Sequence, residues 1–104
     1  MSGANRNYIG FFRGTGAAQT ITEAGFRPRK VKVTHLGDGS TVELVDGEEA
    51  VAADAGGLLT PDDGSAKSFL SAAAGLTITD SGFTVGTSAA CNESGEAFRF
   101  EVQD

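Results

Sequence analysis

The chain has 104 residues, a length typical of a single domain, and 39% of them are hydrophobic, with 15 glycines in addition. Its formal net charge of -6 argues against nucleic acid as a partner, since phosphate binding needs a basic footprint, and no apolar stretch is long enough to span a membrane. One cysteine and one histidine leave no disulfide framework and too few ligands for a zinc site. A chain so rich in turns can bury only a modest core, and we therefore expect it to gain burial by association with copies of itself.

Four short strands are predicted in the first half of the chain, separated by turns that contain glycine. Residues 7–13 form an apolar, aromatic segment that ends at a flexible turn over residues 14–16. Residues 18–23 are rich in β-forming side chains and predict an edge strand. Residues 29–36 and 41–45 alternate apolar and polar side chains, as half-buried strands do, and the glycines between them predict a hairpin.

The middle of the chain has a less regular pattern. Residues 48–53 fit either a short strand or an exposed loop, and residues 56–64 read as a loop because they contain adjacent glycines and a proline. Residues 65–74 have the best helical composition in the chain, with several alanines and a leucine. Asp63 or Ser65 can cap the start of this segment, so one short helix is predicted near residues 65–74.

The last third returns to strand patterns. Residues 76–79, 82–85 and 98–102 alternate apolar and polar side chains between polar turns. Short strands at regular spacing predict an all-β fold, either a small β-sandwich or a jelly-roll-like barrel, in which residues 1–16 are an N-terminal arm or the first strand and residues 17–104 are a single β domain. The predicted core consists of inward-facing apolar residues: Phe26, Val31, Val33, Val42, Leu44, Leu76, Ile78, Phe83, Val85, Phe98 and Phe100.

Charge is unevenly distributed along the sequence. Residues 1–32 carry six basic groups and one acid, a net charge of +5. Residues 33–104 carry two basic groups and thirteen acids, a net charge of -11. Two such halves are expected to attract each other within the fold or between neighbouring copies. The alternative is that the charged side chains of each half only interact with water on a separate face of the protein.

Candidate catalytic and metal-binding groups are sparse. A nucleophile such as Cys91 needs a base, and the single histidine, His35, lies at the end of a predicted strand with no spacing that links the two. Cys91 is expected to be a small buried or half-buried residue instead. Acids cluster in turns, where solvation explains them, although residues 60–65 could offer oxygen ligands to calcium. We therefore expect no enzymatic activity, no cofactor and no small-molecule substrate.

Two segments carry a resemblance to a known group of proteins. Residues 25–33 and 82–86, followed by Asn92, Gly95 and the aromatic pair within residues 98–100, resemble a pattern in small β-rich structural proteins of tailed bacteriophages. The resemblance covers residues 20–102 and implies a virion protein made in the host cytoplasm. The implied role is either a capsid decoration (cement) protein on the capsid exterior or a fibre-type domain on the tail.

Decoration of the capsid is favoured over a fibre because the chain is short and has no stalk. The implied partners are the major capsid protein and the chain itself, as a homotrimer. Aromatic and arginine side chains are enriched at interface cores. The candidate partner-binding residues are therefore the aromatic and basic residues of the first third: Arg6, Tyr8, Phe11, Phe12, Arg13, Arg29, Lys30 and Lys32. The alternative is a tail- or fibre-associated module that binds a receptor or glycan, although a chain with no Trp and one Tyr offers little for sugar stacking.

Overall fold

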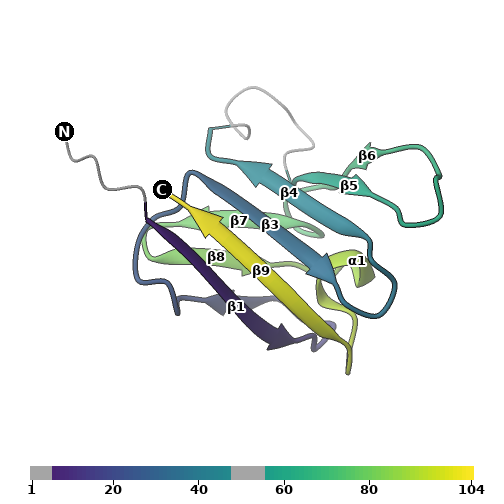
Figure 1. Cartoon of the computed structure of the whole chain (residues 1–104), viewed down its shortest axis with the longest axis horizontal. Helices are drawn as coiled ribbons and strands as arrows, with labels where there is room; N and C mark the ends of the chain where they lie inside the picture. Colours follow the sequence, from purple (N-terminus) through teal and green to yellow (C-terminus); the bar gives the residue numbers. More distant parts are fainter. Residues whose placement is uncertain (1–5, 48–55) are drawn as a thin grey trace.

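The computed structural model describes residues 6–47 and 56–104, and the prediction for residues 48–53 lies outside these ranges. Two antiparallel sheets face each other and form a β-sandwich (Figure 1). The predicted all-β fold is confirmed, and of its two architectures the sandwich is observed, because the sheets of the described residues do not close into a barrel. The described elements are β1 (Asn7–Arg13), β2 (Gln19–Ile21), β3 (Lys30–His35), β4 (Thr41–Val45), β5 (Leu58–Thr60), β6 (Ser68–Phe69), β7 (Leu76–Thr79), β8 (Gly82–Val85), α1 (Ala89–Asn92) and β9 (Ala97–Gln103).

The larger sheet has the strand order β1-β9-β3-β4-β5-β6, and the smaller sheet has the order β2-β8-β7. The C-terminal strand β9 therefore lies between β1 and β3, so the first and last strands of the chain are neighbours (Figure 1). β3 and β4 form the predicted hairpin, with Val31 opposite Leu44 and Val33 opposite Val42. Tight turns between antiparallel strands favour glycine, so the glycines in the sequence correctly mark where one strand ends and the next begins.

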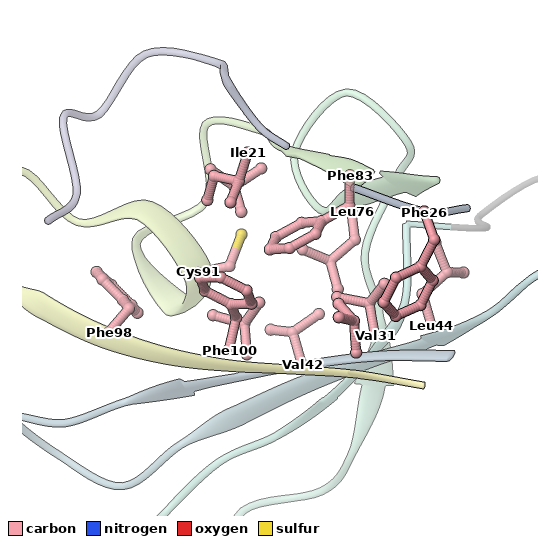
Figure 2. Close-up of a cluster of buried hydrophobic side chains, with 13 residues drawn as sticks. Ile21, Phe26, Val31, Val42, Leu44, Leu76, Phe83, Cys91, Phe98 and Phe100 are labelled. Carbon is pink, nitrogen blue, oxygen red and sulfur yellow. The ribbon is translucent and has the colours of Figure 1, made fainter. Parts of the chain in front are cut away.

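The core lies between the two sheets. Figure 2 shows Phe98, Phe100, Val42 and Val31 on the larger sheet, with Phe83 and Leu76 opposite them. Ten of the eleven predicted core residues are buried, and Ile78 is half-buried against the cluster. The structure adds three residues that the prediction left out of the core, which are Ile21, Cys91 and Val102.

Two local predictions are wrong. The segment predicted as a helix, residues 65–74, contains the two-residue strand β6 and a turn, because Leu70 exchanges backbone hydrogen bonds with Gly56 and Gly57, at 2.8 and 2.9 Å, next to the β5–β6 pair. The helical tendency of alanine is a weak preference that such pairing overrides, and a single short helix is marginal without an apolar face to bury. β5 lies within the segment read as a loop, residues 56–64.

The one described helix lies elsewhere. α1 occupies Ala89–Asn92, between β8 and β9, where only a polar turn was expected. Ser88 caps its start, since the Ser88 hydroxyl accepts a hydrogen bond from the Ala90 backbone N–H at 3.2 Å. Cys91 and Asn92 of this helix are buried, which places α1 at the edge of the core.

Candidate interaction surface

β1 directs alternate side chains to opposite faces of the larger sheet, as the two-residue period of a strand requires. Tyr8 and Phe12 point inward and are half-buried. The Tyr8 ring stacks on Phe100 with a centroid distance of 5.8 Å, and the Phe12 ring stacks on Phe98 at 5.2 Å. The Tyr8 hydroxyl donates a 2.8 Å hydrogen bond to Glu23, and this bond raises the pKa of Tyr8 above its usual value. Tyr8 and Phe12 therefore hold β1 to the domain.

The outward side chains of β1 form an exposed apolar pair. Ile9 is 59% exposed and Phe11 is 64% exposed. The neighbouring strand β9 places Glu101 opposite Ile9 and Arg99 opposite Phe11. Of the aromatic residues predicted to bind a partner, the structure thus leaves Phe11 available on this face, together with Ile9, which the prediction did not include. The two-residue period of a strand over residues 7–13 was the sequence signal that places Ile9 and Phe11 on the same face.

The arginines at the two ends of β1, Arg6 just before the strand and Arg13 as its last residue, are already engaged within the chain. Arg6 forms an ion pair with Asp104 at 2.9 Å, and its guanidinium lies 4.6 Å from the centre of the Phe26 ring. Arg13 donates from Nη1 to the Gly95 carbonyl at 2.6 Å. These contacts join the ends of β1 to other segments of the domain.

The remaining predicted basic residues lie on or just before β3, separated from β1 by β9. Lys30 forms an ion pair with Glu43 at 3.3 Å. Lys32 is opposite Glu43 on one side and Glu101 on the other. Arg29 precedes the strand and is exposed. The structure therefore does not gather the eight candidates into one cluster, and acids lie beside both lysines.

Attraction between the basic first third and the acidic remainder occurs within the fold. Arg27 donates from Nε and Nη2 to the Asp46 carboxylate at 3.1 and 3.0 Å, and from Nη1 to Asp80 at 3.0 Å. The Arg27 hydrogen bond holds the pKa of the Asp46 carboxyl below its usual value. Exposed pairs of this kind contribute little to stability, but they reduce the free basic charge of the first third.

His35 is a buried residue that fastens the β3–β4 turn. Its Nδ1 accepts hydrogen bonds from the backbone N–H groups of Gly37 and Asp38, at 3.0 and 3.2 Å. Nε2 therefore carries the proton and donates to Glu93 at 2.8 Å, so the ring links the turn to the segment after α1. The Cys91 thiol instead donates to the Ala74 carbonyl at 3.6 Å. The two side chains have separate partners and separate structural roles.

The Cys91 thiol is expected to be inert in the native protein. Burial raises its pKa to about 11. At pH 8 only about one thiol in a thousand would be ionised, and the thiolate is the reactive form. We expect a disulfide reagent such as DTNB to label Cys91 only after unfolding in guanidinium chloride. A Ser94→Cys variant, with its added thiol at an exposed position, is the control and should gain one rapidly labelled group. Rapid labelling of native wild type would contradict this expectation.

Asn92 forms a buried polar connection that the sequence analysis did not find. Its Oδ1 accepts hydrogen bonds from the Thr15 backbone N–H at 2.9 Å and from Gln19 Nε2 at 3.0 Å. Its Nδ2 donates to the carbonyls of Ala17 and Gly86, both at 2.7 Å. One side chain thereby satisfies four groups and joins the β1–β2 connection to α1 and to the end of β8.

No protein-family model matches the chain, and comparisons with curated proteins and with solved structures give no match either. Within residues 6–47 and 56–104, no three His, Cys, Asp or Glu side chains are grouped so that they could hold a metal ion. Among the same residues, no helix has the length and hydropathy needed to cross a membrane. Among the described residues, Ile9 and Phe11 on the edge strand β1 are the two most exposed large hydrophobic side chains.

Proposed function

We propose that this protein is a capsid decoration (cement) protein of a tailed bacteriophage, which binds the outer shell and stabilises it by bridging neighbouring subunits. The observation that supports this role best is the Ile9–Phe11 pair, because exposed apolar side chains on a well-anchored strand are suited to burial against another protein. A protein that binds only the assembled shell lowers the free energy of that state by mass action. The proposed partners are the major capsid protein and further copies of this chain, which we expect to be arranged as homotrimers on the shell.

The contact with the shell is expected to be mainly apolar. Arg6, Arg27 and Lys30 already have acidic partners within the chain. Salt screens contacts between exposed charges and has less effect on apolar burial. The proposed attachment therefore depends on β1 more than on the basic residues of β3.

The decisive experiment is to purify particles from the source culture on a density gradient and count copies of this chain per particle by mass spectrometry. Hundreds of copies, comparable to the major shell protein, are expected for a decoration protein. A few copies or a few dozen would instead place the chain on the tail or a fibre, where a glycan array would test receptor binding. Absence from particles would overturn the virion role.

Attachment should survive salt and fail when Phe11 becomes charged. We expect wild-type protein to remain on particles when sodium chloride is raised from about 0.1 to 0.5 M, where the screening length falls to a few ångströms. The Phe11→Lys variant should show strongly reduced occupancy. Phe69→Lys is the matched control, since Phe69 is 58% exposed but lies on β6, at the opposite edge of the sheet. Loss of wild-type protein in salt would show that the basic residues carry the contact.

A further inference from the structure

The free edge of β1 offers unpaired main-chain groups. At the ends of β1, the Asp104 N–H donates to the Arg6 carbonyl and the Gly14 N–H donates to the Glu96 carbonyl, both at 2.9 Å. The main-chain N–H and C=O groups of residues 6 and 14 therefore point toward β9. Because the direction of these groups alternates along a strand, those of the other even-numbered residues also point toward β9. The odd-numbered residues of β1 direct their N–H and C=O groups away from β9, where no described strand lies beyond β1.

This edge lacks the features that normally prevent strand pairing. The seven residues of β1 contain no proline and no lysine, and their register with β9 runs from Asn7 to Arg13 without a bulge. The Arg13 carbonyl is occupied by the Gln19 amide at 3.1 Å, which leaves Ile9 and Phe11 at the accessible part of the edge. The other described edge strands are shorter, with two residues in β6, three in β2 and four in β7.

From this geometry we infer that two copies of the protein associate by pairing β1 with β1 in antiparallel orientation, about a two-fold axis at Gly10. In this register Ile9 of one copy is opposite Phe11 of the other, and the reverse pair is also formed. Both are hydrogen-bonded positions, because Ile9 and Phe11 direct their main-chain groups to the free edge. The two larger sheets become one continuous sheet across the axis. The inference does not depend on a virion role.

The apolar side chains of β1 favour this register over its neighbours. In the Gly10-centred register both Ile9 and Phe11 lie opposite an apolar side chain. A shift of two residues in one direction would bring Ile9 opposite Ile9 but Phe11 opposite Asn7. The opposite shift would bring Phe11 opposite Phe11 but Ile9 opposite Arg13. The charges of β9 do not distinguish these registers, because Arg99 and Glu101 of each copy form an ion pair at 3.6 Å and lie three strand spacings, about 14 Å, from those of the other copy.

Pairing of the two β1 strands brings the Ile9 and Phe11 side chains of both copies together and leaves them exposed on the outer face of the sheet. Side chains of a strand point perpendicular to the sheet, so Ile9 and Phe11 of both copies would form one four-residue apolar patch. Such a patch doubles the surface available to a shell protein. The contact is two-fold, and in a trimeric assembly it would join copies that belong to neighbouring trimers.

The expected affinity is modest. Two paired seven-residue strands bury less than the roughly 1,200 Å² of a standard interface, so we expect a dissociation constant of about 10–100 µM. Sedimentation velocity of the intact protein from about 1 µM to 1 mM should show a monomer–dimer equilibrium. A wild-type protein that stays monomeric throughout this range would overturn the inference.

The register is tested by charge exchange. Ile9→Glu and Phe11→Lys each place charges against an apolar partner twice in the homodimer and should weaken self-association by about tenfold. In an equimolar mixture of I9E and F11K proteins, the new acid of one chain is opposite the new base of the other, while the second pair stays Ile9–Phe11. The mixture should therefore dimerise more tightly than either variant alone. Circular dichroism and unfolding of each variant confirm that the fold is retained.

A further variant tests the main-chain pairing by removing one of its hydrogen-bond donors. In Phe11→Pro the lost N–H faces the free edge, which is the position where edge strands tolerate proline. It should abolish dimerisation, whereas Phe69→Lys should leave it unchanged. Self-association that persists in F11P, or a mixture of I9E and F11K that stays as weak as its components, would overturn the proposed contact.

Discussion

The Asn92→Ala variant is expected to lower the free energy of unfolding by about 2–4 kcal/mol. The side chain is fully buried and its four hydrogen bonds to Thr15, Gln19, Ala17 and Gly86 are 2.7–3.0 Å long. Alanine would leave these groups without their partner; the hydrogen bond to the buried Gly86 carbonyl is itself buried, and the other three are part-buried. Chemical denaturation followed by circular dichroism measures the effect, and a loss below about 1 kcal/mol would contradict it.

Two further variants show whether hydrogen bonding at Asn92 is responsible. Asn92→Asp keeps the shape but directs a carboxylate at the carbonyls of Ala17 and Gly86, so it should be at least as destabilising near pH 7. Such a site favours the neutral acid and raises its folded-state pKa. Stability of N92D should therefore increase as pH falls through that raised pKa, whereas N92A should show no such recovery. Ser94→Ala, at an exposed position two residues away, is the control and should be close to wild type.

The Gly10→Ala variant is expected to lose about 2–4 kcal/mol of stability because a side chain at Gly10 overpacks the core. An added Cβ would lie 2.4 Å from Phe100 Cζ and 2.6 Å from Phe100 Cε2. The Phe100 ring cannot move aside freely, since Phe83 packs against it with a centroid distance of 5.3 Å and Tyr8 stacks on it at 5.8 Å. Equilibrium unfolding in urea measures the loss.

A double-mutant cycle identifies Phe100 as the cause. Phe100→Leu alone leaves a cavity and should cost about 1–2 kcal/mol. In the G10A background the same change removes the clashing ring atoms, so its cost should vanish or become a gain, with a coupling above about 1 kcal/mol. Additive effects of the two substitutions would show that the ring accommodates the methyl group by another route.

Patterns with a period of two were sufficient to predict most strands and the core. Val31, Val33, Val42 and Leu44 are buried as predicted because alternation is a local property of a strand beside one apolar layer. The helix predicted over residues 65–74 was wrong because alanine content alone provides no apolar stripe for packing. The true helix is only four residues long, and its one clear signal is the capping residue Ser88.

The candidate interaction surface was predicted less completely than the core. The aromatic content of residues 7–13 correctly drew attention to β1, but which side chains face the solvent depends on the sheet that β1 joins. Phe12 is half-buried over Phe98, whereas Phe11 is exposed beside Arg99. The basic residues were likewise judged by their position along the chain, although Arg6 meets its acidic partner Asp104 at the opposite terminus.

By itself, the sequence determined an all-β domain, the limits of its principal strands and the side chains that fill its core, because turns and alternation act over a few residues. The tertiary structure decided the strand order, with β9 between β1 and β3, and therefore which edge of the sheet stays open. It also brought Asn92 to the loop after β1 and separated Ile9 and Phe11 from Tyr8 and Phe12. Such contacts join residues far apart in the chain, and their free energy depends on the whole packed structure and on no single segment.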